Sequence, residues 1–259
     1  MKNFLLAFLL TTGFAAAAQT EQELVNIEYL INNGRGNAVY SDLNAFIKKY
    51  PSNPQAYFLR AKYYFQNKNH KAALQDIDIA LKFSPLNADY HELKGGILFL
   101  GKKYSQAGES FEKAFQTGNS HENCRYKAAE SFFSAKNFQR AETLLKGFAE
   151  NDSAKLLLTK IQSENGDNIA ALKTVNTIEK KNADFYFARG VIYGKSEMYE
   201  RSIDDLNTAL DLNPSLTEIY LWRGLSYYFS GQKQNARQDW NTALKHRHFK
   251  ANDYLEKYR

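Results

Sequence analysis

The side chains best suited to catalysis or metal binding are few and scattered in this sequence of 259 residues. Five histidines stand at positions 70, 91, 121, 246 and 248, and no two are four residues apart, the spacing that puts two metal ligands on one face of a helix. Gly-rich phosphate loops, nucleophile elbows and paired-carboxylate motifs do not stand out. We therefore predict that the protein is not an enzyme and has no cofactor and no metal site.

Two smaller features leave alternatives open. His246 and His248 lie in the basic run KHRHFK, which is compatible with metal or anion binding, although a solvated helix end is the favoured interpretation. The single cysteine, Cys124, has no partner for an intramolecular disulfide. A small core residue is its favoured interpretation, and a reactive or intermolecularly paired thiol is the alternative.

Charged residues show one regular spacing. Three arginines are each followed sixteen residues later by an aspartate: Arg60 by Asp76, Arg189 by Asp205, and Arg223 by Asp239. Where the equivalent first position holds Lys94, Ala128 or Leu158, the second position holds no acid. Because the arginine and the acid appear and disappear together, the pattern predicts a bidentate bridge between two adjacent helices. A structural role that fixes helix register is favoured over a functional one.

The elements that carry these residues are predicted to be short helices in pairs. Residues 183–216 read ADFYFARGVIYGKSEMYERSIDDLNTALDLNPSL, in which small residues recur where two helices approach and large apolar residues fill the space between them. Pro214 ends the second helix. One such pair cannot bury its own apolar face, so the stretch implies neighbouring pairs.

This stretch resembles the tetratricopeptide repeat. The matching residues, at relative positions 4, 8, 11, 17, 20, 24, 27 and 32, are Tyr186, Gly190, Tyr193, Tyr199, Ser202, Leu206, Ala209 and Pro214. The resemblance implies an all-α fold, an α-solenoid of stacked helix-turn-helix repeats with a C-terminal capping helix. It also implies partner binding as the broad role of the protein.

Related units extend along the chain. A degenerate N-terminal repeat is predicted at 19–53, an array at 54–250, and a capping helix at 251–259. The array divides into repeats at 54–87, 88–121, 122–151, 152–182, 183–216 and 217–250. The repetition favours one elongated domain over two compact ones. Between 122 and 182 the spacing shortens to about 30 residues, which predicts clipped helix ends and a bent or mobile middle.

The resemblance also implies a binding site, because the first helices of such repeats line a concave groove. The partner-binding residues that it implies here are Phe58, Lys62, Phe65, Glu92, Phe99, Tyr126, Phe133, Phe187, Lys195 and Tyr228, with Leu100, Glu130, Lys160, Glu164, Leu221 and Phe229 beside them. Aromatic side chains dominate this set, and exposed apolar area of this kind usually marks a binding site. Packing of these aromatics against adjacent repeats is the alternative for each residue.

One known binding mode of the family is not expected. Chaperone-binding cytosolic members hold a terminal carboxylate with lysine at position 5 and asparagine at position 9. The corresponding residues here are Phe58 and Lys62 in one repeat and Phe187 and Val191 in another, so this carboxylate clamp is absent from the sequence.

The N-terminus has the layout of a secretory signal. Lys2 precedes an apolar run from Phe4 to Leu10 and then three alanines, which predicts a signal peptide at 1–18 with cleavage after Ala18. No later segment approaches the roughly 20 apolar residues of a membrane-spanning helix. The predicted location is therefore periplasmic or secreted.

These features predict a non-enzymatic scaffold or adaptor of the bacterial cell envelope that binds a protein or peptide partner, such as cell-envelope machinery, in its groove. An envelope-surface or glycan-binding protein is the alternative, because groove aromatics also stack on sugars. Nucleic-acid binding is disfavoured by the signal, by the proline at position 32 of the repeat and by the modest net charge of +6.

Overall fold

The computed structural model describes residues 21–31, 36–118, 122–146 and 151–258, which form helices and turns with no strand among them. The predicted signal peptide lies outside the described residues. None of the helices within these ranges is both long and apolar enough to cross a membrane.

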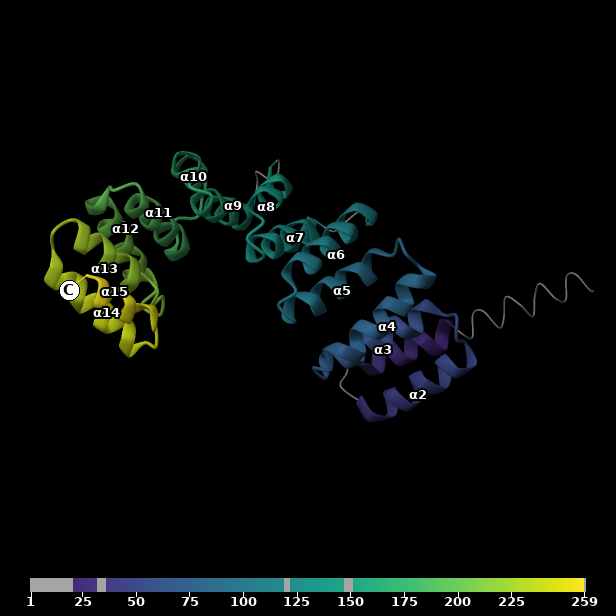
Figure 1. The fold of residues 1–259 in the computed structure, drawn as a ribbon. Helices are drawn as coiled ribbons and strands as arrows, with labels where there is room; N and C mark the ends of the chain where they lie inside the picture. The colour runs from purple at the N-terminus through teal and green to yellow at the C-terminus, as the bar shows by residue number, and fades with distance from the viewer. Residues whose placement is uncertain (1–20, 32–35, 119–121, 147–150, 259) are drawn as a thin grey trace, which may run out of the picture. The chain divides into compact units, whose positions relative to one another are not determined.

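Short turns join the helices in successive pairs along the chain (Figure 1). A helix at 21–31 precedes α2 (Gly36–Lys49). The pairs that follow are α3 (Pro54–Gln66) with α4 (His70–Phe83), α5 (Ala88–Leu100) with α6 (Tyr104–Thr117), α7 (Glu122–Ser134) with α8 (Phe138–Leu145), α9 (Asp152–Glu164) with α10 (Asn168–Val175), α11 (Ala183–Lys195) with α12 (Tyr199–Leu212), and α13 (Ile219–Phe229) with α14 (Lys233–Lys245). The last helix is α15 (Lys250–Lys257).

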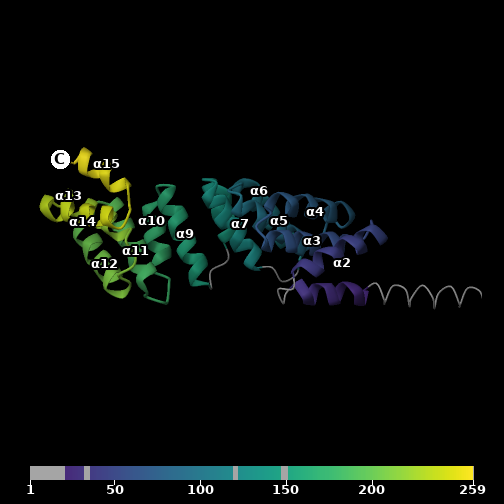
Figure 2. The same ribbon diagram turned by 90° about the horizontal axis from the view of Figure 1, so that it is seen from below.

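The chain folds as two compact units, Met1–Ser131 and Phe132–Arg259, here called the N-terminal and C-terminal units. In the N-terminal unit, α3 lies beside α4 and α5 beside α6 (Figures 1 and 2), and residues such as Leu59 and Ile77 are fully buried between helices. In the C-terminal unit, α11 packs on α12 and α13 on α14, around the buried Leu206 and Trp240. Each unit therefore buries the apolar faces of its helices against neighbouring helices.

Asparagine and aspartate side chains start many of these helices. Where the residue before a helix is described, seven helices begin after an asparagine or aspartate whose side-chain oxygen accepts a hydrogen bond from a backbone N–H two or three residues further on: Asn53, Asn69, Asn87, Asn137, Asn151, Asp167 and Asn182. Such a cap satisfies one of the free N–H groups at a helix start and stabilises the helix by about 1 kcal/mol. This contribution helps helices of only eight residues, such as α8 and α10, to form.

In each repeat between residues 54 and 250, the turn between the two helices passes through a left-handed backbone conformation. The residues in this conformation have φ between 57° and 87°: Lys68, Lys102, Lys136, Gly166, Glu197 and Gly231. Each stands fifteen residues into its repeat, so the same turn geometry recurs along the chain. Glycine adopts this φ without strain, and the other residues at this position accept a cost of about 1 kcal/mol each.

The three predicted arginine–aspartate bridges are present. In each, the arginine Nε and Nη2 donate to the two carboxylate oxygens, at 2.6 and 2.8 Å for Arg60–Asp76, 2.7 and 2.8 Å for Arg189–Asp205, and 2.8 and 2.7 Å for Arg223–Asp239. The bridges join the first and second helices of one repeat. All three aspartates are buried, so these are desolvated ion pairs and not surface pairs.

Each bridge also has a third member, which the sequence analysis missed. The remaining arginine nitrogen, Nη1, donates to an asparagine of the preceding repeat. Arg60 donates to Asn44 on α2 at 2.6 Å, Arg223 to Asn207 on α12 at 2.7 Å, and Arg189 to Asn176, the residue after α10, at 3.5 Å. Lys94 makes a similar contact across repeats, with Asp78 at 2.7 Å. The arginines therefore hold successive repeats together as well as the two helices of one repeat.

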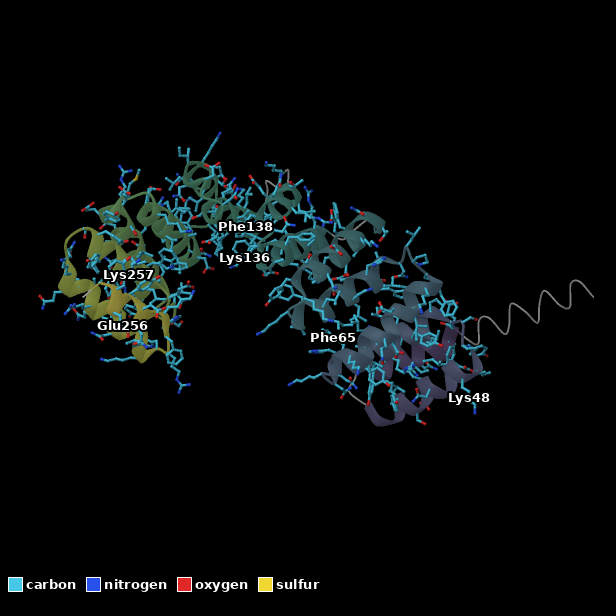
Figure 3. All side chains as sticks on the ribbon, viewed as in Figure 1. Lys48, Phe65, Lys136, Phe138, Glu256 and Lys257 are labelled. Atoms are coloured by element: carbon cyan, nitrogen blue, oxygen red, sulfur yellow. The ribbon has the colours of Figure 1, made fainter. Side chains whose placement is uncertain are left out.

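The last helix, α15, covers the apolar side of the final repeat (Figure 1). Tyr254, Leu255 and Tyr258 pack against the core that contains Trp240. The rings of Trp240 and Tyr258 are stacked, with centroids 5.7 Å apart. Glu256 and Lys257, labelled in Figure 3, are exposed on the same helix. An amphipathic helix of this kind closes the end of a repeat array.

Candidate functional site

A groove of about 670 Å³ runs across the first helices of the N-terminal unit. This N-terminal groove is formed by residues of helix 21–31, α3, α5 and α7, with one side chain from α6. Its lining residues are Glu28, Phe58, Lys62, Phe65, Asp89, Glu92, Leu93, Gly96, Phe99, Leu100, Phe111, Lys127 and Glu130. The groove is therefore built from successive repeats, and each contributes one or more side chains.

Aromatic rings form much of the surface of this groove. Phe58 packs on Tyr90 with ring centroids 4.8 Å apart, and Phe65, labelled in Figure 3, packs on His70 at 5.8 Å. The hollow between the rings depends on Gly96, because a Cβ atom added there would meet only Phe65 Cζ, at 4.0 Å. The groove thus combines fixed apolar rings with open space, as ligand sites do.

Ion pairs between adjacent repeats fix the two lysines of the groove. Lys62 Nζ lies 3.0 Å from Glu28, and Lys127 Nζ lies 2.8 Å from Glu92. Sequence reasoning missed Glu28 and Lys127, yet a signal existed, because Glu28 and Lys62 are separated by 34 residues, one full repeat. The lysine charges are therefore already compensated inside the groove.

A second, smaller groove of about 280 Å³ lies in the C-terminal unit. This C-terminal groove is lined by Phe133, Thr159, Lys160, Ser163, Glu164, Phe187, Ala188, Val191, Ile192, Glu218 and Trp222. Lys195 lies at its side, 2.8 Å from Glu164 and with Nζ 5.7 Å from the centre of the Trp222 ring. Trp222 was not among the predicted residues, because its repeat position lies next to the predicted groove positions.

The structure groups most of the predicted partner-binding residues. Phe58, Lys62, Phe65, Glu92 and Phe99 line the N-terminal groove, and Phe133 and Phe187 line the C-terminal groove.

Tyr126 and Tyr228 lie outside both linings. Tyr126 is half-buried on α7, and burial, with a smaller effect of Glu130, raises the pKa of its hydroxyl group. Tyr228 packs against Tyr258, the residue that follows α15, with ring centroids 4.5 Å apart, and so belongs to the C-terminal core. The ring of Tyr228, which the resemblance had assigned to the groove, therefore packs against the C-terminal capping segment.

His121 lies outside the described residues, and the other side chains considered for chemistry are engaged in packing or hydrogen bonds. Within the described ranges, no group of three or more histidine, cysteine, aspartate or glutamate side chains gathers as a metal site. His246 stacks on Tyr220 with ring centroids 6.0 Å apart, and His248 Nε2 lies 2.6 Å from Thr217 Oγ1. Cys124 is buried, and burial together with the nearby Glu92 raises the pKa of its thiol to about 12.

Comparison with known families finds two matching stretches. Residues 41–88 and residues 183–216 each match a model described as tetratricopeptide repeat. The chain therefore contains tetratricopeptide repeats, and the second match covers the same residues as the repeat that dominates the sequence pattern. No curated protein matches the sequence.

Solved structures share this fold at low sequence identity. A tetratricopeptide repeat protein from Parabacteroides merdae has a TM-score of 0.65 at 17% identity, over 88% of this chain and 93% of that one. The C-terminal part of a repeat-containing protein from Cytophaga hutchinsonii has a TM-score of 0.66 at 15% identity, over 89% of this chain and 98% of that one. A chain of the APC/C hetero-tetramer Cut9–Hcn1 has a TM-score of 0.61 at 16% identity. The match covers 91% of this chain but only 48% of the other chain, so this protein spans about half of its length. The predicted fold class, an all-α solenoid of tetratricopeptide type, is confirmed.

Proposed function

We propose that this protein is a non-catalytic scaffold that binds a segment of another protein in its N-terminal groove. The observation that carries the proposal is the groove itself, about 670 Å³ and lined by four phenylalanines from successive repeats. Leu100, at its edge, leaves 57% of its surface exposed. Apolar surface gathered in a groove of this size is typical of binding sites.

The repeat architecture favours a protein segment as the ligand. The lining residues recur at intervals of about one repeat, so the groove offers a row of similar subsites in place of one closed pocket. An extended or helical peptide has side chains at regular intervals that suit such a row. A chain of similar fold is part of the Cut9–Hcn1 hetero-tetramer, which agrees with a role in assembly.

The setting that we propose is the bacterial cell envelope, with the protein periplasmic or secreted and its partner a component of envelope machinery. The support is the layout of residues 1–18, in which a lysine, an apolar run and small residues follow one another. Detection of mature protein that begins at Gln19 in a periplasmic or culture fraction tests this part of the proposal. Full-length protein in the cytoplasm would contradict it.

The groove is tested by filling it without disturbing the fold. Gly96→Leu places a side chain in the hollow, where a new Cβ has only one contact, at 4.0 Å. The change also replaces a helical glycine, which favours the helix by about 0.8 kcal/mol, so binding and folding are expected to change in opposite directions. Ser105→Leu, at an exposed position of α6 outside the groove lining, is the matched control.

The assay is affinity capture from envelope extract with mature wild-type protein and both variants, after thermal melts show that each is folded. We expect a protein that the wild type and Ser105→Leu retain and that Gly96→Leu loses. If the three forms retain the same proteins, the groove does not bind the partner. Groove-dependent capture of peptidoglycan fragments, with no protein, would replace this proposal with the glycan-binding alternative.

A further inference from the structure

We infer that the N-terminal groove selects a protein segment that carries lysine or arginine beside its apolar anchor residues. This inference rests on the proposed function and adds the chemistry of the partner. It follows from the sign of the charges in the lining, from the way in which some of them are already paired, and from their position beside aromatic rings.

The lining of the groove has a surplus of acid. Its charged side chains are four carboxylates, Glu28, Asp89, Glu92 and Glu130, and two lysines, Lys62 and Lys127. This gives the lining a net charge of −2, whereas the whole chain has a net charge of +6. The negative sign is therefore a local property of the groove and does not reflect the composition of the protein.

Both lysines of the lining form ion pairs within the protein. Lys62 pairs with Glu28 at 3.0 Å and Lys127 with Glu92 at 2.8 Å, so neither lysine of the lining is paired with Glu130. The remaining carboxylate, Asp89, has a further contact within the protein, so the inference depends on Glu130. Among the described residues, Glu130 has no ion-pair partner within 4.0 Å.

Glu130 is placed to act on a ligand. Its side chain is half-buried on α7 and faces the same groove as the rings of Phe65 and Phe99. A carboxylate in a partly desolvated site attracts a cation more strongly than one in open water. A ligand that buries apolar side chains among the rings will also need to compensate this carboxylate, and a lysine or arginine does so directly.

The C-terminal groove provides an internal comparison. Its lining holds Glu164, Glu218 and Lys160, and Glu164 is already paired with Lys195 at 2.8 Å. Counted over its lining, this groove has a net charge of −1, against −2 in the N-terminal groove, and Lys195 beside it adds a second lysine. A weaker preference for cationic segments is therefore expected of the C-terminal groove.

The test begins with a phage-displayed library of random 12-residue peptides, selected on immobilised mature wild-type protein and, in parallel, on Gly96→Leu. Peptides enriched on the wild type alone are groove-dependent binders. One of them is then synthesised in three forms, with its lysines and arginines kept, replaced by serine, or replaced by glutamate. Affinity is measured by fluorescence anisotropy for wild type, Glu130→Gln and the control Glu109→Gln, an exposed acid on α6 outside the groove.

We expect lysine or arginine to be enriched in the groove-dependent peptides, and the serine form to bind wild type about tenfold more weakly. Glu130→Gln should weaken binding of the cationic peptide and reduce its advantage over the serine form, whereas Glu109→Gln should change neither. High salt should shrink the same advantage, since exposed charge interactions are screened.

Two results would overturn the inference while leaving the proposed function in place. The first is a set of groove-dependent peptides that are neutral or acidic, and the second is an unchanged affinity of Glu130→Gln for the cationic peptide. A third result, in which no enriched peptide depends on Gly96, would instead show that the groove is not a peptide site, and both proposals would fail.

Discussion

Loss of Arg223 should destabilise the protein because it leaves a buried carboxylate without its cation. The side chains of Arg223 and Asp239 are only 15% and 7% exposed, and two hydrogen bonds of 2.8 and 2.7 Å join them. Arg223→Leu removes these bonds and also the donor to Asn207. Leucine is a reasonable replacement, since the chain itself places buried Ala128 and Leu144 at the corresponding positions of another repeat.

The size of the effect follows from the burial of Asp239. Removing one partner of a buried ion pair costs about 3–5 kcal/mol, and the lower end applies here because the arginine side is partly exposed. For a protein of this size we expect a fall in melting temperature of about 6–12 °C, at about 2–4 °C per kcal/mol. The double variant Arg223→Leu/Asp239→Leu leaves no charge behind, so we expect its free energy of unfolding to lie within about 1 kcal/mol of wild type.

The measurement is urea unfolding, followed by circular dichroism and by tryptophan fluorescence, which reports on Trp222 and on the fully buried Trp240 of the same repeat. A double-mutant cycle with Arg223→Leu, Asp239→Leu and the double variant gives the coupling energy, which we expect to be at least about 2 kcal/mol. A coupling energy near zero would refute the reasoning, because the two side chains would then contribute independently. Unchanged stability of Arg223→Leu alone would refute it as well.

Three further outcomes follow from other parts of the structure. Gly224→Ala should lower the free energy of unfolding by about 2 kcal/mol, because its new Cβ would lie 2.7 Å from Trp240 Cδ1. Gly96→Ala, where a Cβ has room, should leave the melting temperature unchanged or raise it. Equal melting temperatures of the two variants would contradict this expectation. Burial, aided by two lysines and opposed by a hydrogen bond to a backbone carbonyl, lowers the pKa of His91 below 6.5, so its contribution to stability is full above pH 6.5 and declines as the pH falls below that value. Between pH 7.5 and 5.5 the melting temperature of wild type should therefore fall more than that of His91→Gln, and equal falls would rule the effect out. Cys124, whose burial raises the thiol pKa to about 12, should react with Ellman's reagent only as the protein unfolds, and rapid reaction of the native protein would be the contrary result.

Sequence reasoning succeeds here where one repeat contains the whole pattern. The arginine and the aspartate of a bridge stand sixteen residues apart on the two helices of a single repeat, so their joint presence in three repeats is visible in one chain. The asparagine that completes each bridge lies across a repeat boundary. Asparagine is also common in this chain as a helix cap, as at Asn53 and Asn69, so its second role has no distinct signal in the sequence.

The groove was predicted only in part, for reasons of packing. Phe58 and Phe99 follow from their position on first helices, but Phe111 comes from a second helix and reaches the lining beside Gly95, where a Cβ would lie 2.7 Å from its ring. Tyr228 has an equivalent position on a first helix, yet α15 covers it. Periodicity reveals which way a side chain points, and not whether a later segment folds back over it.

The hydrogen-bonded sets of one asparagine, one arginine and one aspartate affect how the protein can be divided into transferable modules. In one such set, Asn44 lies on α2, Arg60 on α3 and Asp76 on α4. A fragment that begins at Pro54, where the repeat begins by sequence, would keep Arg60 and lose one of its acceptors. The self-contained module is instead the helix triplet α2–α3–α4 or α12–α13–α14, and grafts of this protein onto another solenoid should be cut before the second helix of a repeat.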